Sequence, residues 1–286
     1  MRIAVLSGKG GTGKTFVSVN LAYAVKDIVY IDCDVEEPNG GLFLKPLIER
    51  EEIIEVMEPS VDNEKCNGCK KCVDFCQYNA LAYVNDQLLI FNELCHSCRG
   101  CVLLCPEKAL AETKRGIGQI EYGKSADVKV RTGILNPGEA NGIPIIQKLL
   151  RDAAQEKTVV IDCPPGSSCA VMESIKDSDY CILVAEPTLF GVHNLSMVYE
   201  LVKLFDKPYG VVLNKTVEGE TIAEDYCREN NIPILMRIPY DPEIALLNSR
   251  GEIAAAHKVE HLGLFEELLG KITGGCSLET TSCTKW

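Results

Sequence analysis

The sequence lacks the features that mark membrane, exported and nucleic-acid-binding proteins. No apolar run approaches the ~18 residues that a membrane-spanning helix needs. The opening segment turns glycine-rich at Gly8, which is too early for a secretory signal peptide. No basic run is longer than the pair Lys70-Lys71, and the net charge is −12, so the overall field repels nucleic acid and anionic lipid. We therefore expect a cytoplasmic protein that binds neither nucleic acid nor a membrane.

Cysteine, by contrast, is abundant. The chain has 15 cysteines, an odd number, and no export signal, so regular spacing among them indicates metal ligands rather than disulfides. Two runs share the spacing C-x2-C-x2-C-x3-C, which indicates a duplicated small unit. The first run is Cys66, Cys69, Cys72 and Cys76, and the second is Cys95, Cys98, Cys101 and Cys105.

This spacing resembles that of bacterial ferredoxins, in which three cysteines of a run hold one [4Fe–4S] cluster and the fourth reaches the other cluster. Gln77 stands where ferredoxins have a proline after the first run, and this departure affects only the local turn. Zinc bound by C-x2-C pairs is the alternative, but it leaves the third cysteine of each run without a role. The resemblance implies a first cluster on Cys66, Cys69, Cys72 and Cys105, and a second on Cys76, Cys95, Cys98 and Cys101.

Residues 8–15 satisfy the phosphate-loop pattern G-x-x-x-x-G-K-[ST] between a predicted strand and a predicted helix. In such a loop, backbone N–H groups converge on phosphate oxygens, and the helix N-terminus adds partial positive charge. Lys14 is expected to reach the β- and γ-phosphates, and the Thr15 hydroxyl to bind Mg²⁺. The nucleotide-binding residues predicted here are Gly8, Lys9, Gly10, Gly11, Thr12, Gly13, Lys14 and Thr15.

Outside the cysteine-rich segment, short apolar strands alternate with helical patterns, for example at residues 2–6, 14–25 and 28–31. This alternation predicts an α/β fold, a mostly parallel sheet with helices on both faces. We expect a P-loop ATPase domain over residues 1–58 and 113–273, an inserted ferredoxin-like α+β domain over 59–112, and a C-terminal tail over 274–286. In the tail, Cys276 and Cys283 are either a thiol pair that handles iron or ordinary exposed residues.

Lys9 is not required by the phosphate-loop pattern, and with it the loop resembles the deviant Walker A motif, K-G-G-x-G-K-[ST], of the MinD/Mrp/ParA class. In that class the early lysine crosses a dimer interface and touches the partner's nucleotide. The resemblance implies an ATP- and Mg²⁺-dependent homodimer with slow hydrolysis. The last helical segment, residues 260–269, is acidic rather than basic as in MinD, which weighs against membrane targeting.

The same resemblance extends to segments that follow predicted strands. Asp34 matches the residue that orients or activates the attacking water, so the catalytic residues implied are Lys9, Lys14 and Asp34. Asp162 matches the residue that holds Mg²⁺ through water, and the Gly166 amide matches the γ-phosphate sensor. Asp residues at strand ends suit a ligand site in an open α/β sheet. The segments implied to contact the base are Asn214 and the loop of Pro239, Tyr240 and Asp241.

Three functions are compatible with these motifs. In the first, ATP-driven changes of the dimer alter electron transfer through two [4Fe–4S] clusters. In the second, the chain is an ATP-dependent carrier or scaffold for iron–sulfur cluster assembly. In the third, it is a positioning ATPase with a redox sensor, which the negative charge disfavours. Two closed four-cysteine sites favour electron transfer over carriage, because four thiolates retain a cluster. The redox or metalloprotein partner stays unnamed.

Overall fold

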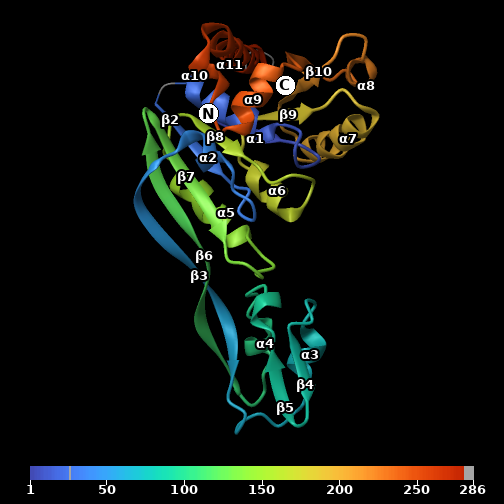
Figure 1. The fold of residues 1–286 in the computed structure, drawn as a ribbon. Coiled ribbons are helices and arrows are strands. Elements are labelled where there is room, and N and C mark those ends of the chain that lie inside the picture. Colours follow the sequence, from blue (N-terminus) through green and yellow to red (C-terminus); the bar gives the residue numbers. More distant parts are fainter. Residues whose placement is uncertain (26, 280–286) are drawn as a thin grey trace.

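The computed structural model describes residues 1–25 and 27–279 and shows an α/β body joined by a narrow arm to a smaller unit (Figure 1). In this described part, one sheet has nine strands in the order β11-β10-β9-β1-β8-β2-β7-β6-β3. Strands β11 to β7 of this order run parallel, while β6 and β3 are antiparallel additions at one edge. The strands are β1 (Arg2–Leu6), β2 (Ile28–Asp32), β3 (Leu47–Val61), β6 (Leu110–Ser125), β7 (Val128–Leu135), β8 (Val159–Asp162), β9 (Tyr180–Ala185), β10 (Tyr209–Thr216) and β11 (Ile234–Pro239).

Helices cover both faces of this sheet. One face packs against α5, α6, α7 and α8, and the other against α1, α9, α10 and α11. Alternate residues of β1 point to opposite faces: Ala4 lies in the first core and Ile3 in the second, as the two-residue period of a strand requires. The helices are α1 (Lys14–Ala24), α2 (Gly40–Leu44), α5 (Ile143–Asp152), α6 (Cys169–Ile175), α7 (Leu189–Leu204), α8 (Ile222–Glu229), α9 (Pro242–Ser249), α10 (Ala254–His257) and α11 (Val259–Glu279).

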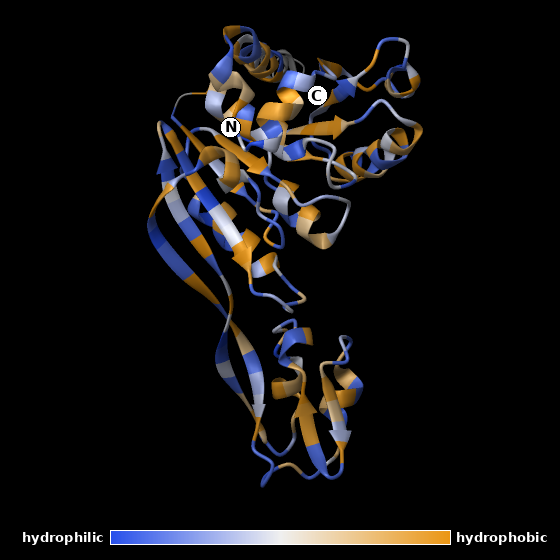
Figure 2. Cartoon of the chain, viewed as in Figure 1, coloured by the Kyte–Doolittle hydropathy of each residue, from blue (hydrophilic) through white to orange (hydrophobic). Residues whose placement is uncertain are grey.

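The prediction of a mostly parallel α/β sheet is confirmed. Figure 2 shows the reason: the central strands are apolar along most of their length, as expected when both faces are buried. Asp241 caps α9 through its side chain, with Pro242 in the first turn, both residue types that favour a helix start. Helix α7 begins at Leu189, where the hydroxyl of the N-cap residue Thr188 accepts a hydrogen bond from the Gly191 amide, at 2.9 Å.

The arm between the two units is the feature that sequence reasoning missed. Strands β3 and β6 pair from Leu47 opposite Lys124 to Val61 opposite Leu110, while β7 contacts only the part of β6 from Gly118 onward. The remaining half of the β3–β6 ladder therefore leaves the sheet as a free two-stranded ribbon (Figure 1). The register between β3 and β6 shifts at the point where the ribbon leaves the sheet, so that Ile117 of β6 has no partner on β3 and forms a β-bulge. A bulge bends its strand and increases its twist.

The smaller unit follows at the end of this ribbon. It contains α3 (Lys71–Phe75), the hairpin of β4 (Leu81–Val84) and β5 (Gln87–Ile90), the 3₁₀ turn η1 (Asn92–Leu94) and α4 (Gly100–Leu103). The boundaries expected at residues 59 and 112 fall inside β3 and β6, where Pro59 lies opposite Glu112. The unit is thus joined to the sheet by continuous hydrogen-bonded strands and not by loops.

Helix α11 runs to Glu279, whereas the sequence indicated a tail from residue 274. The helix continues through Gly274 because a glycine keeps the backbone hydrogen bonds of a helix and lowers only the intrinsic helix propensity. Cys283 lies outside the described residues, and of the Cys276 side chain nothing is described. Within residues 1–25 and 27–279, no helix is both long and apolar enough to span a membrane.

The burial of β6 at the sheet edge gives a stability prediction. Ile120 on β6 is fully buried in the core, whereas Ile53 on the outer strand β3 is 71% exposed. Ile120→Ala should lower the free energy of unfolding by about 2–4 kcal/mol, because it leaves a cavity among packed side chains. Ile53→Ala, the matched control, should change it by less than about 0.5 kcal/mol. Urea unfolding followed by circular dichroism measures both, and equal effects would show that β6 is not part of the core.

Candidate nucleotide site and cysteine cavities

The phosphate loop connects β1 to α1 at the carboxyl edge of the parallel strands. Gly13 has a φ of 98°, and a side chain there would collide with the Asn214 amide. At Gly8, a Cβ atom would lie 2.1 Å from the carbonyl oxygen of Asn194. These two glycines let the loop pack closely against β10 and α7, so its backbone is held in one shape before any ligand binds.

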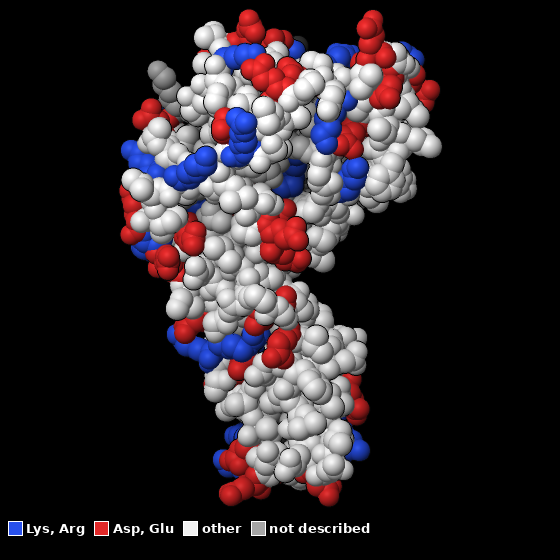
Figure 3. Space-filling view, viewed as in Figure 1, with Lys and Arg blue, Asp and Glu red and all other residues white. Residues whose placement is uncertain are grey.

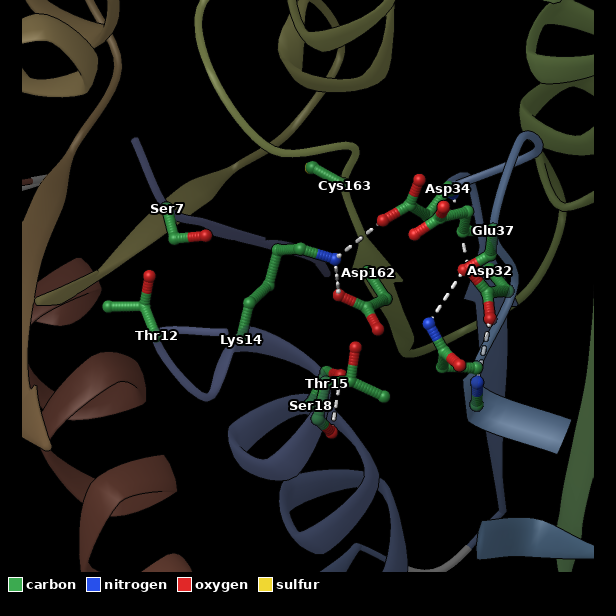
Figure 4. Close-up of polar contacts among 12 residues, drawn as sticks. Ser7, Thr12, Lys14, Thr15, Ser18, Asp32, Asp34, Glu37, Asp162 and Cys163 are labelled. Carbon is green, nitrogen blue, oxygen red and sulfur yellow. Dashed lines mark hydrogen bonds and ion pairs between the residues drawn. The ribbon is translucent and has the colours of Figure 1, made fainter. Parts of the chain in front are cut away.

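Lys14 is a buried cation between two carboxylates (Figure 4). Its Nζ donates a hydrogen bond to Oδ1 of Asp162, at 2.7 Å, and forms an ion pair with Oδ2 of Asp34, at 3.6 Å. Burial by itself disfavours the charged amine, but the two carboxylates outweigh it and raise the pKa of Lys14 above its usual range. The lysine is therefore charged and already directed at the place where phosphate charge would arrive.

Asp32 and Tyr30 complete the buried polar network. The Asp32 carboxylate accepts hydrogen bonds from the backbone N–H of Asp34, at 3.1 Å, and of Gly40, at 2.8 Å. Burial, and then the charge of Asp162, raise the pKa of Asp32 to about 8. The Tyr30 hydroxyl donates to Oδ2 of Asp162, at 2.9 Å, which fixes the orientation of that carboxylate. Sequence reasoning did not single out Asp32 or Tyr30, although both stand on the strand that leads to Asp34.

An open pocket of about 690 Å³ borders this network. Its volume is within the range of small-molecule sites, and it lies where open α/β sheets bind ligands. Lys14, Thr15 and Asp34 line it, together with residues from the loops that follow β2, β7 and β8. These further lining residues include Val35, Glu37, Asn39, Gly142, Pro164 and Ser168.

Several residues predicted to contact nucleotide are bonded within the chain. The Gly166 amide donates to the carbonyl oxygen of Ser7, at 2.9 Å. The Asn214 side chain donates to the carbonyl oxygen of Thr12, at 2.8 Å, and so holds the phosphate loop. Tyr240 is exposed at the same edge of the sheet. Pro239 is also exposed, and Asp241 caps α9 through the Glu243 amide, at 2.7 Å.

Lys9 is likewise paired within its own chain. Its Nζ lies 2.9 Å from Glu186, which also binds Lys215 at 2.7 Å. Lys215 in turn donates to the carbonyl oxygen of Gly11, at 3.0 Å. Glu186 was missed by sequence reasoning; its position directly after β9, at the carboxyl edge of the sheet, is the signal that would have found it.

The cysteines of the two runs border two cavities in the smaller unit. Cys66, Cys69 and Cys72 of the first run share a cavity with Cys105 of the second. The other cavity combines the remaining members, Cys76, Cys95, Cys98 and Cys101. In the described part of the chain, no three Cys, His, Asp or Glu side chains converge as around a single metal ion.

The remaining described cysteines have ordinary surroundings. Cys181 and Cys227 are buried in the core of the body. Cys33 and Cys163 are also buried, next to the nucleotide pocket, and burial raises the pKa of both thiols. Only Cys169 of this group is exposed, at the start of α6.

Fold and site together define a P-loop nucleotide-binding protein, because a phosphate loop opens a helix at the carboxyl edge of a parallel sheet. Residues 3–254 match the model of the CobQ/CobB/MinD/ParA nucleotide binding domain. The chain belongs to this family of P-loop ATPases.

Relatives and solved structures agree with this assignment. An uncharacterised protein of Methanocaldococcus jannaschii is 36% identical over 222 residues, 75% of this chain and 78% of the relative. A second uncharacterised protein of that organism is 30% identical over 264 residues, 88% and 90% of the two chains. The fold is similar to that of the cell division ATPase MinD of Pyrococcus furiosus, with a TM-score of 0.59, 20% identity and coverage of 94% and 98%. MinD of Pyrococcus horikoshii, complexed with Mg-ADP, has a TM-score of 0.58 at 19% identity, covering 95% of both chains.

The raised pKa of Asp32 predicts a pH dependence for the nucleotide-free protein. The folded chain retains a proton that the unfolded chain has lost above about pH 4, so folding binds a proton up to about pH 8. The free energy of unfolding should therefore fall as the pH rises from about 5.5 to 8. Asp32→Asn should flatten this slope, and the exposed control Asp177→Asn should keep it. Urea unfolding at several pH values measures the slope, and an unchanged slope in Asp32→Asn would contradict the assignment.

Proposed function

We propose that this protein is a homodimeric Mg-ATPase whose nucleotide-driven changes control electron transfer through two [4Fe–4S] clusters bound in an inserted ferredoxin-like domain. The observation that carries the proposal is the grouping of the cysteines. Each cavity combines three cysteines of one run with the fourth of the other, Cys105 in one case and Cys76 in the other. This exchange is the arrangement by which bacterial ferredoxins bind two clusters.

The residues around the two cavities fit such clusters. Five of the eight cysteines pack in a small apolar core around Leu81, Leu88 and Leu110, and this core would shield the clusters from water. The unit is shorter than the ~70 residues at which an apolar core alone gives adequate stability, so bound metal would be expected to stabilise it. Each cluster, when bound, would take up one electron from a one-electron donor protein and return it to an acceptor.

For the nucleotide, the proposal assigns roles to residues that lie together around the pocket. Lys14 would exchange its contact with Asp162 for the β- and γ-phosphates of ATP. Thr15 and Asp162 would then hold Mg²⁺, the latter through water, and Asp34 would orient the attacking water. The partly buried position of Asp34 supports this role, because burial raises the pKa of its carboxyl against the opposing effect of Lys14.

The surroundings of Lys9 support a dimer that forms on ATP binding. The lysine is held by Glu186 and lies over the ring of Phe190, 5.2 Å from its centroid. Leu189 and Phe190 are 73% and 61% exposed, so apolar surface lies beside the pocket. In a second copy seated on this edge, Lys9 would leave Glu186 and bind the nucleotide of the partner.

The smaller unit offers a surface for the electron partner. Figure 3 shows that the front of this unit carries few charged residues, most of which lie at its lower end and right edge. Leu103 and Leu104 on the α4 side, and Phe75 and Tyr78 near α3, are exposed beside the cysteines. We assign these side chains to the docking of a redox protein.

The metal content tests the central claim. Anaerobically purified protein should contain about eight iron and eight sulfide per chain, with visible charge-transfer absorbance. Cys98→Ser should alter only the second cluster and Cys69→Ser only the first, because these exposed cysteines line different cavities. Tightly bound zinc without that absorbance would refute the proposal. Transfer of intact clusters to an apo-ferredoxin, with nucleotide-independent potentials, would instead support the cluster-carrier function.

Nucleotide binding and hydrolysis test the ATPase roles. Lys14→Ala should abolish ATP binding, because the phosphates lose their buried cation. Asp34→Ala should bind ATP and hydrolyse it at least tenfold more slowly. Calorimetry and phosphate release measure the two effects, and equal loss of binding in both variants would contradict the assignment of Asp34.

The dimer has its own test. Lys9→Ala should bind ATP but fail to dimerise, whereas Glu186→Gln, which releases Lys9, should dimerise at lower ATP concentration. Lys176→Ala is the control and should behave as wild type, because Lys176 is an exposed residue at the C-terminal end of α6 that pairs with Glu173 and does not line the pocket. Analytical ultracentrifugation with and without Mg-ATP measures the association. Dimerisation by Lys9→Ala equal to wild type would show that the lysine acts only within its own chain.

A further inference from the structure

The smaller unit contacts the ATPase body through the loop between β7 and α5, residues 136–142. The Ala140 amide donates to the carbonyl oxygen of Glu93 in η1, at 3.3 Å. The Asn136 amide donates to the carbonyl oxygen of the bulged residue Ile117, at 2.9 Å. This loop of the body therefore binds both the smaller unit and the point at which the ribbon leaves the sheet.

Arg115, just beyond the bulge on β6, joins the parts at this junction. Its guanidinium forms ion pairs with Glu139 of the loop and with Glu58 of β3. All three side chains are largely buried, at 18%, 10% and 12% exposure for Arg115, Glu139 and Glu58. Charges in such surroundings are screened less than surface pairs.

One carbonyl group connects Arg115 to the second cysteine cavity. The oxygen of Asn92 accepts a hydrogen bond from Nη2 of Arg115, at 2.7 Å, and another from the backbone N–H of Cys95, at 3.0 Å. Glu58, the ion-pair partner, itself lines that cavity. The Arg115 guanidinium thus shares the Asn92 carbonyl oxygen with the backbone of Cys95, and it places a positive charge beside the four cysteines of the second cavity.

The other end of the loop borders the nucleotide pocket. The Leu135 amide donates to the carbonyl oxygen of Val35, at 2.8 Å. Gly142 packs so closely on Val35 that a Cβ atom would lie 2.4 Å from its Cγ2. Val35 directly follows Asp34, and both line the pocket with Gly142. A shift of Asp34 on nucleotide binding would therefore move the loop that carries Glu139.

The first cysteine cavity has no comparable connection. Its lining residues bond to one another, as when Asn67 donates to Glu107 at 3.0 Å. Among the described residues, no hydrogen bond or ion pair joins that lining to the body beyond the ribbon. The two cavities therefore differ in their access to the nucleotide site.

From this difference, and resting on the proposed function, we propose that Arg115 is the positioning residue that makes the second cluster, on Cys76, Cys95, Cys98 and Cys101, respond to ATP. The response passes from Asp34 through the loop to Glu139, and from Glu139 to Arg115. When Glu139 is drawn away, the positive charge of Arg115 is less compensated, and the added electron of a reduced cluster is stabilised. Mg-ATP then raises the reduction potential of the second cluster and leaves the first unchanged.

The test is a redox titration of the anaerobic holoprotein, followed by electron paramagnetic resonance, with and without Mg-ATP. All variants in this titration retain Asp34. A non-hydrolysable ATP analogue is used, so that the nucleotide is not hydrolysed during the measurement. Arg115→Gln should lower the reduction equilibrium constant of the second cluster about tenfold, or 59 mV for one electron, and abolish the nucleotide-dependent shift. Glu139→Gln should raise that constant, and Arg115→Lys should retain most of the wild-type behaviour. Cys69→Ser and Cys98→Ser assign each potential to its cluster.

The matched control is Arg99→Gln. Arg99 also lines the second cavity but pairs with Glu112 of the ribbon, at 2.5 Å, and is more exposed. This variant removes the same charge beside the same cluster and should keep the nucleotide-dependent shift. Iron at about eight per chain shows that the fold is retained in each arginine and glutamate variant.

The outcomes separate the two proposals. A chain without iron, or without nucleotide-dependent change in either cluster, overturns the coupling in the proposed function and this inference with it. A shift that occurs on the first cluster, or persists in Arg115→Gln, overturns only the role of Arg115. Reciprocity adds an independent readout. In the wild type, reduction of the second cluster must change the affinity for ATP by the same factor by which ATP changes the reduction equilibrium constant of that cluster. In Arg115→Gln, reduction must leave the affinity for ATP unchanged.

Discussion

The ladder of hydrogen bonds between β3 and β6 determines how this molecule is connected. These strands begin as the edge of the sheet that carries the nucleotide pocket and end inside the cysteine-rich unit. A flexible linker would let the two units move independently, whereas paired strands transmit bending and twist. The bulge at Ile117 marks the point where the ribbon is free to bend, and the loop of the body holds that point through Asn136.

In the nucleotide pocket, the groups expected to contact ATP are bonded to other groups of the same chain. Lys14 binds Asp162, Lys9 binds Glu186, and the Gly166 amide binds Ser7. Each is a group that ATP would engage, and each has a polar partner within the chain. Because buried polar groups cost free energy when unpaired, ATP bound as proposed would replace these contacts with contacts to its own phosphates. Such an exchange would move the former partners of Lys14, which include Asp34, and the neighbouring Val35 contacts the loop that reaches the smaller unit.

This arrangement also explains why a buried cluster of carboxylates is tolerated. Asp32, Asp34 and Asp162 surround one lysine, so the negative charge exceeds the positive charge. Hydrogen bonds from backbone amides and from Tyr30 stabilise this excess negative charge, and a proton retained on Asp32 up to about pH 8 reduces it. Mg²⁺, held beside Thr15 and Asp162 as proposed, would place a positive charge next to these carboxylates and offset part of the charge of ATP.

Much of the fold could be predicted from the sequence, for identifiable reasons. Buried parallel strands such as β9 are continuously apolar, and their helices carry recognisable starts, as at Asp241. The outer strand β3 could not be recognised in the same way. Its side chains are mostly exposed and rich in glutamate, so no hydrophobic alternation distinguishes it from a loop.

The sequence by itself determined the local chemistry: the phosphate loop around Lys14 and the two cysteine runs, because these depend on residue type at fixed spacing. Only the tertiary structure decided which groups meet across the chain. It paired Lys9 with Glu186, and it placed Arg115 between Glu139 and the second cavity. Contacts of this kind join residues far apart in the chain, and their geometry follows from strand register and loop packing, for which a single sequence carries no periodic signal.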